Sequence, residues 1–188
     1  MKTIRSRAAL PALAVALLAL PGAQAIAEEV TCSGTLAAVT VDNLRVPSGA
    51  TCKLYGTRVQ GTITVEYRGV LRAEGAMVIG NVQAEGARSV SVLLGSRVGG
   101  SVQVKLGGSA LVSDSRVDGD VQYDENSAPV RVLRTQVGGS VQIVKNYGGV
   151  TVRRNTINGN LQCKENNPVP VGGGNIVGGS KEDQCARL

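Results

Sequence analysis

Five carboxylates lie close together between residues 114 and 125, and such side chains could carry out chemistry. A pair of carboxylic acids can cleave a glycosidic bond, with one acting as general acid and the other as base or nucleophile. Carboxylate oxygens are also the ligands that calcium prefers. With Asp118 and Asp120 as the reacting pair, the segment predicts one alternative function, a small carbohydrate-active enzyme of the polysaccharide lyase or hydrolase type. The five residues are Asp114, Asp118, Asp120, Asp124 and Glu125.

The rest of the chain argues against catalysis by this segment. The chain has no histidine, so neither a Ser/His/Asp nor a Cys/His catalytic set can form. The carboxylates do not recur at one repeat position, and connecting turns of a few residues would not build the walls of a cleft. We therefore expect a solvated acidic patch and a non-enzymatic protein, with no catalytic residue, no metal and no cofactor.

Four cysteines form two pairs with similar spacing. Cys32 and Cys52 are 20 residues apart, and Cys163 and Cys185 are 22 apart. Both separations are close to the repeat length described below, and neighbouring strands lie about 4.8 Å apart, a distance that a disulfide can span. We predict the disulfides Cys32–Cys52 and Cys163–Cys185, one at each end of the fold, formed in an oxidising compartment.

Glutamines recur at intervals of 19 or 20 residues, with Thr64 preceding them at the same spacing. Amides in such a column could hydrogen-bond to one another along a stack, or they could bind the hydroxyls of a polysaccharide. No aromatic column accompanies them on which sugar rings could stack. The candidate binding residues are Gln83, Gln103, Gln122, Gln142 and Gln162. A second column, two residues earlier, is expected to point to solvent from the same face and contains Thr62, Asn81, Ser101, Asp120, Ser140 and Asn160.

Arginines form a third candidate surface. Arg97 and Arg116 share a repeat position with Arg58, and they could engage acidic polysaccharide or anionic lipid headgroups. Alternatively, scattered arginines keep a β-protein soluble and discourage edge pairing. Residues 28–188 carry 17 basic and 14 acidic residues, because three of the 20 basic residues lie before them. That small positive excess falls well short of a nucleic-acid-binding footprint.

The element that must position these residues is a short repeat with the pattern V-x-G-x-V-x-V. Alternating apolar residues follow each glycine, which predicts a strand with one buried face. A second strand follows about ten residues later in each unit, from Val90–Val92 to Val169–Val171. A unit of this length cannot bury its own apolar face, so successive units must stack. The repeating glycines are Gly61, Gly80, Gly100, Gly119, Gly139, Gly159 and Gly178.

The pattern resembles right-handed parallel β-helix proteins, and more closely a group of small uncharacterised exported bacterial proteins with this coil. The resemblance covers residues 28–188 and implies the fold without implying an activity. We expect an all-β, single-stranded right-handed parallel β-helix, a β-solenoid of about 7–8 coils of 19–20 residues. A left-handed helix built from hexapeptides would need a strict six-residue period, which these steps lack.

The N-terminal residues predict export. Lys2, Arg5 and Arg7 precede an apolar stretch over residues 8–20. The small residues of a signal-peptide cleavage site follow, and the pattern Ala25-Ile26-Ala27 places the cleavage after Ala27. We expect a signal peptide at 1–27, an N-terminal cap with a worn first coil at 28–56, solenoid coils at 57–179 and a capping tail at 180–188. The expected protein is periplasmic or extracellular and monomeric, with no membrane span. It is a secreted scaffold or binding protein that displays flat polar ladders, with a polysaccharide or an envelope protein as partner.

Overall fold

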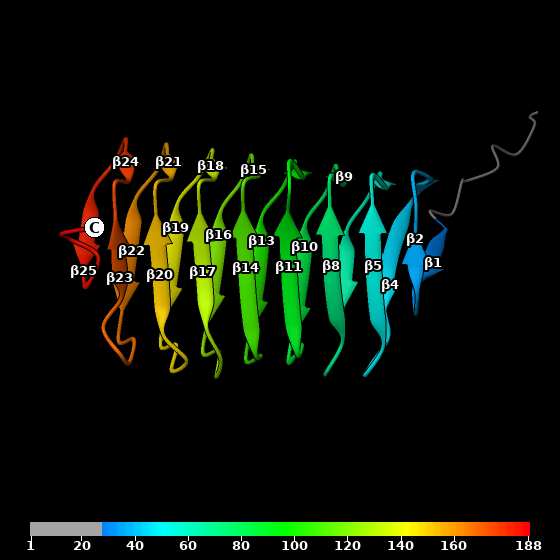
Figure 1. Cartoon of the computed structure of the whole chain (residues 1–188), viewed down its shortest axis with the longest axis horizontal. Helices are drawn as coiled ribbons and strands as arrows, with labels where there is room; N and C mark the ends of the chain where they lie inside the picture. Colours follow the sequence, from blue (N-terminus) through cyan, green and yellow to red (C-terminus); the bar gives the residue numbers. More distant parts are fainter. Residues whose placement is uncertain (1–27) are drawn as a thin grey trace, which may run out of the picture.

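Alternating apolar and polar residues form short strands throughout residues 28–188, which are the part of the chain that the computed structural model describes. These residues contain 25 strands and no α-helix, and they build a parallel β-solenoid of about seven turns (Figure 1). The predicted fold class is therefore confirmed. The predicted signal peptide, residues 1–27, lies outside the described residues. Within residues 28–188, no helix is long and apolar enough to cross a membrane.

Each coil contributes one strand to each of three parallel sheets. Sheet A consists of β1 (Glu29–Thr31), β4 (Asn43–Val46), β7 (Ile63–Val65), β10 (Val82–Glu85), β13 (Val102–Lys105), β16 (Val121–Asp124), β19 (Val141–Val144), β22 (Leu161–Lys164) and β25 (Lys181–Asp183). Sheet B consists of β2 (Thr35–Leu36), β5 (Thr51–Tyr55), β8 (Val70–Glu74), β11 (Ser89–Leu93), β14 (Ser109–Ser113), β17 (Val130–Leu133), β20 (Val150–Arg153) and β23 (Val171–Gly173). Sheet C consists of β3 (Thr40–Val41), β6 (Arg58–Val59), β9 (Met77–Val78), β12 (Arg97–Val98), β15 (Arg116–Val117), β18 (Gln136–Val137), β21 (Thr156–Ile157) and β24 (Ile176–Val177).

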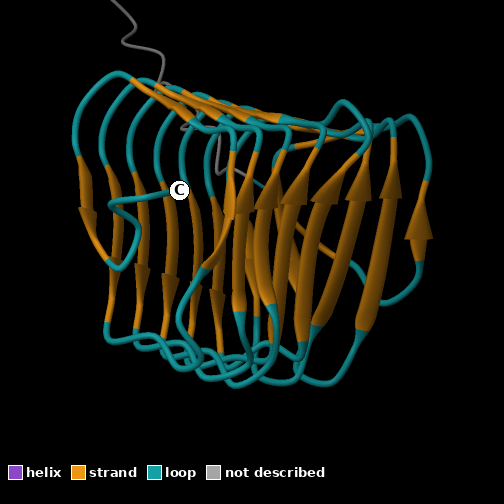
Figure 2. Cartoon of the chain, turned by 60° about the vertical axis from the view of Figure 1, so that its left-hand side comes forward, coloured by secondary structure: helices purple, strands orange, loops and turns teal. Residues whose placement is uncertain are grey.

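The path of the chain around the coil is right-handed. In Figure 1 the strands of sheet B run upward in front, the chain crosses the top through sheet C, and the strands of sheet A descend behind. The coils advance from right to left while the chain follows this path. Figure 2, seen closer to the C-terminal end, shows the same order, with upward strands on the right and downward strands on the left.

The interior is made of stacked columns of aliphatic side chains. In sheet A, Val82 pairs in register with Val102, Val102 with Val121, and Val121 with Val141. All four side chains are fully buried. β-Branched residues suit such a wall because their restricted χ1 angles fit a pleated surface. Stacking therefore hides the apolar face that no single coil could cover.

The corner between sheets C and A brings the backbones of successive coils close together. A Cβ atom added to Gly80 would lie 2.6 Å from the carbonyl oxygen of Gly61 in the preceding coil. Real side chains do not tolerate that separation, so the repeating glycine is required by close approach. The glycine column thus fixes the place where each chain turn enters sheet A, the sheet that carries the glutamines.

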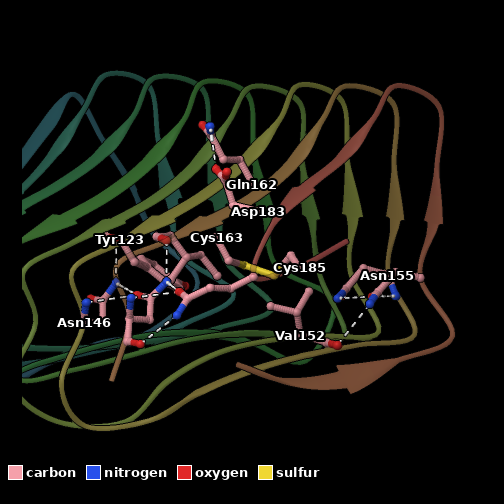
Figure 3. Close-up of a disulfide and its surroundings, with 12 residues drawn as sticks. Tyr123, Asn146, Val152, Asn155, Gln162, Cys163, Asp183 and Cys185 are labelled. Atoms are coloured by element: carbon pink, nitrogen blue, oxygen red, sulfur yellow. Dashed lines mark hydrogen bonds between the residues drawn. A yellow bond between two sulfur atoms is a disulfide. The ribbon is translucent and has the colours of Figure 1, made fainter. Parts of the chain in front are cut away.

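The two ends of the solenoid are closed by disulfides. Cys32 and Cys52 are bonded with Cα atoms 5.5 Å apart, and Cys163 and Cys185 with Cα atoms 5.2 Å apart (Figure 3). Both predicted pairings are confirmed. The worn first coil stacks on the coil that follows it, with Leu44 in register with Ile63.

The last coil departs from the expected alignment by one residue. The strand expected at Val169–Val171 lies at Val171–Gly173, where Thr151 pairs with Val171, and Ile157 then pairs with Val177. Gly179 occupies the corner that we expected for Gly178, because its N–H donates to Gly159 O as the N–H of Gly159 does to Gly139 O. The side chains of Val169 and Val171 are 64% and 59% exposed. A terminal coil has no following coil to cover it, so its inward positions are under weaker constraint.

Candidate functional site

The glutamine column runs along the outer face of sheet A. Register pairs Gln83 with Gln103, Gln103 with Gln122, and Gln122 with Gln142, and Gln162 continues the series. Among the described residues, the column makes a single side-chain hydrogen bond, from Gln162 Nε2 to Asp183 Oδ2 at 3.2 Å (Figure 3). No hydrogen bond joins two of these amides to each other. The other four amides are therefore open to an external ligand.

The second predicted column does not point freely into solvent. Its side-chain oxygens instead accept hydrogen bonds along the solenoid axis from the backbone of the next coil. The N–H of Ser101 donates to Asn81 Oδ1 at 2.8 Å, and the N–H of Asp120 donates to Ser101 Oγ at 3.0 Å. The same pattern continues through Ser140 and Asn160. These residues are half-buried as far as Ser140, and their hydrogen bonds stabilise the stack. Of the glutamines beside them, Gln83 and Gln142 are exposed and the other three are half-buried.

The restricted composition of that second column is the signal that could have revealed its role. Each member follows the corner glycine and is Asn, Asp, Ser or Thr, a short side chain with an oxygen acceptor. Such residues readily accept hydrogen bonds from nearby backbone N–H groups. A ligand-binding surface would not require an acceptor at every coil.

An open hollow of about 820 Å³ lies at the N-terminal part of the glutamine column. Thr64, Gln83 and Gln103 line it from the sheet. Tyr67 and Leu106 contribute apolar side chains from the turns that follow sheet A, and these side chains are 64% and 57% exposed. Sequence reasoning missed Tyr67 because a single tyrosine in a turn does not form a column.

Two carboxylates also line the hollow. Glu66 accepts hydrogen bonds from Arg45 Nη1 at 3.1 Å and from the backbone N–H of Ser48 at 2.9 Å. The hydrogen bond from Arg45, with those from Ser48, lowers the pKa of Glu66 below its usual value. The other carboxylate, Glu85, belongs to none of the ion pairs found in residues 28–188.

The predicted arginine surface is brought together on sheet C by a carboxylate. Arg97 Nη2 lies 2.8 Å from Asp118 Oδ2, and Arg116 Nε lies 2.5 Å from Asp118 Oδ1. These two guanidinium groups lower the pKa of Asp118, with the hydrogen bond from Arg97 as the larger cause. Arg97 and Arg116 are thus neutralised in part, which weakens their attraction for an external anion.

The acidic constellation is dispersed among separate partners. Arg134 Nε and Nη2 each lie 2.6 Å from a different oxygen of Asp114, and this contact, with Ser113, lowers the pKa of Asp114 to about 2. Asp118 and Asp120 lie on opposite sides of the Gly119 corner, with Asp118 bonded on sheet C and Asp120 accepting from Ser140 at the edge of sheet A. A general acid must hold a proton near neutral pH, and the lowered pKa values of Asp114 and Asp118 do not suit that role. In residues 28–188, no group of three His, Cys, Asp or Glu side chains gathers as metal ligands would.

No family model, curated protein or solved structure matches this chain. The candidate site therefore rests on its own geometry. The structure aligns the five glutamines that the sequence predicted, adds Tyr67 at one end, and assigns the neighbouring polar column to the stack.

Proposed function

We propose that this protein is an exported, non-enzymatic binding protein that holds an extended polysaccharide along the glutamine column of sheet A. One observation carries the proposal. Four amides in register, Gln83, Gln103, Gln122 and Gln142, make no hydrogen bond within the described residues. Each amide offers two donor hydrogens and one acceptor oxygen, which is a match for the paired hydroxyls of a sugar ring.

The spacing of the column suits a linear ligand. Successive coils are separated by about 4.8 Å, which is close to the length of one sugar unit in an extended chain. A polysaccharide parallel to the solenoid axis could therefore meet one amide per sugar. Because the sheet is rigid and the amides are already aligned, little ordering of the protein accompanies binding, and preorganisation of this kind favours affinity.

Other features support a secreted binding protein over an enzyme. The two disulfides are compatible with an oxidising compartment. The carboxylates nearest to a catalytic arrangement are held ionised by arginines. The hollow on sheet A is open to solvent, whereas hydrolytic enzymes exclude water from an enclosed cleft.

A glycan-binding measurement on residues 28–188 tests the proposal. We expect a neutral linear polysaccharide in a panel of neutral and acidic glycans to bind. Replacing Gln103 and Gln122 together by Ala removes two sugar contacts of about 1 kcal/mol each, so the affinity falls roughly 30-fold. The matched control is Gln136→Ala, an exposed glutamine on sheet C, which leaves glycan affinity unchanged. A panel without any bound glycan, or a double variant that binds as tightly as the control, would overturn the proposal.

A further inference from the structure

We infer that the hollow beside Tyr67 is the specificity subsite of this surface and accepts an uncharged sugar ring stacked on the Tyr67 side chain. The inference rests on the proposed function, because it assigns the hollow to one end of the same polysaccharide. It goes further than that function, because it states that the protein prefers neutral glycans to uronic-acid chains and assigns this preference to Tyr67 and Glu85.

The Tyr67 ring is held in place from the next coil. A Cβ atom at Gly86 would lie 2.8 Å from Tyr67 Cδ2, so the ring occupies space that a side chain at residue 86 would fill. Gly86 has φ of +64°, a conformation that glycine adopts without strain. The guanidinium carbon of Arg68 lies 5.8 Å from the ring centroid, within the range of a cation–π contact. The ring is thus positioned before a ligand arrives.

Tyr67 is nevertheless accessible to a ligand. Tyr67 is 64% exposed and lines the hollow. An aromatic face carries partial negative charge, and it attracts the C–H groups that cover one face of a sugar ring. Leu106, 57% exposed and also lining the hollow, adds a second apolar contact. Tyr67 therefore supplies the aromatic contact that the glutamine column by itself lacks.

The hollow continues the glutamine column without a break. Thr64, Gln83 and Gln103 belong both to the column and to the lining of the hollow. A sugar ring against Tyr67 would therefore have its hydroxyls near the first amides, while the following sugars extend toward Gln122. One ligand can occupy both parts.

The charge of the hollow favours an uncharged ligand. The carboxylates of Glu66 and Glu85 line it. Glu66 is paired with Arg45 at 3.1 Å, whereas Glu85 belongs to none of the ion pairs of residues 28–188, so Glu85 supplies the uncompensated negative charge. The one lysine in the lining, Lys105, lies 3.6 Å from Asp124, which reduces its attraction for another anion. A sugar carboxylate would face like charges, and like-charge contacts disfavour the wrong partner.

Calorimetric titration with matched neutral and uronic-acid oligosaccharides tests the inference. We expect the neutral oligosaccharide to bind more tightly, and Tyr67→Ala to weaken its binding roughly tenfold through loss of the stacked contact. Tyr67→Phe retains the affinity because the ring is kept. The matched control is Tyr147→Ala, a tyrosine that is 59% exposed and lies in a later turn after sheet A. Glu85→Gln should raise the affinity for the acidic oligosaccharide relative to the neutral one.

Saturation-transfer NMR adds a direct measurement of stacking. Irradiating the aromatic protons should transfer saturation to the C–H protons of the sugar in the native protein and in Tyr147→Ala, and more weakly in Tyr67→Ala. Tighter binding of the uronic-acid chain, or equal affinity and equal transfer in the Tyr67→Ala and Tyr147→Ala variants, would overturn the inference. If the inference were overturned in this way while the Gln103 and Gln122 double variant lost most of its glycan affinity, the proposed function would stand and the Tyr67 subsite would not. If the native protein bound no oligosaccharide, both would fail.

Discussion

The corners of the solenoid are filled differently in its N-terminal and C-terminal halves. At the corner after sheet A, the early coils place Ala87 and Gly107 inside, whereas later coils place Asn126, Asn146 and Asn166 at the same repeat position. The corner after sheet B changes in a similar way, from Thr57, Ala76 and Ser96 to Asn155 and Asn175. The same backbone turn is thus built on small residues in one half and on buried amides in the other.

The buried asparagines form ladders parallel to the axis. Asn146 Nδ2 donates to Tyr123 O at 2.9 Å and to Asn166 Oδ1 at 3.0 Å, while Asn146 Oδ1 accepts from the backbone N–H of Asn126 at 3.0 Å (Figure 3). In the early coils, Ala87 and Gly107 contribute no polar side chain to this corner. The N–H of Gly108 donates to Ala87 O at 2.8 Å, and the N–H of Gly107 donates to Asn126 Oδ1 of the next coil at 3.0 Å. Hydrogen bonds in a dry interior reinforce one another, so single side chains should matter more to the C-terminal half.

The largest expected effect comes from the valine columns, which the two halves share. Val102→Asp and Val141→Asp would each bury an unpaired charge, at a cost of about 5 kcal/mol or more, so we expect both variants to lose the β-sheet signal in circular dichroism. A native spectrum for either variant would contradict the inward assignment. If Val102→Asp unfolded only the early coils in hydrogen exchange, the two halves would be separate folding units.

The next largest effect compares how much one polar side chain stabilises each kind of corner. Asn146→Ala leaves Tyr123 O and the N–H of Asn126 without their buried partner, so we expect the free energy of unfolding to fall by about 3 kcal/mol. Ser96→Ala removes a buried hydroxyl at the other corner, which donates to Leu93 O at 2.7 Å and accepts from the N–H of Ala76 at 3.1 Å. Because the hydroxyl of Ser96 serves fewer groups than the amide of Asn146, its loss should cost less, about 1.5 kcal/mol. Urea unfolding of both variants gives the comparison. Equal losses would show that the ladder adds nothing beyond the hydrogen bonds of one buried hydroxyl.

Tyr123 lies where the two kinds of coil meet, and its substitution should have a smaller effect of opposite sign. Its side chain is fully buried, its hydroxyl has no hydrogen-bond partner among the described residues, and burial raises its pKa. Tyr123→Phe removes that unsatisfied group, so we expect the free energy of unfolding to stay equal or rise by about 1 kcal/mol. A loss of more than about 1 kcal/mol in urea unfolding would mean that the hydroxyl has a partner in solution.

Features that repeat could be predicted from the sequence. The buried valines, the outward glutamines and the register between coils followed from a spacing of 19 or 20 residues, and the disulfides followed from that spacing together with the position of the cysteines. The asparagine ladders could not, because Asn beside a strand is also the ordinary signature of a solvent-exposed turn. Tyr67 and the shifted last coil were missed for the same physical reason: each occurs once, so no period marks it.

The smallest expected effect lies on the outside of the sheet B corner, where the halves also differ. At successive coils the residue with positive φ there is Leu94, 62% exposed, then Asp114 and Arg134, which bind each other. Because this contact lowers the pKa of Asp114 to about 2, below its ordinary value of about 3.9, it stabilises the folded state above the ordinary pKa. That stabilisation is lost as the pH falls through about 2. A double-mutant cycle with Asp114→Asn and Arg134→Ala should therefore show a small coupling at pH 7 that decreases progressively below about pH 4. A coupling that stayed constant on acidification would show that the two side chains interact through packing and not through charge.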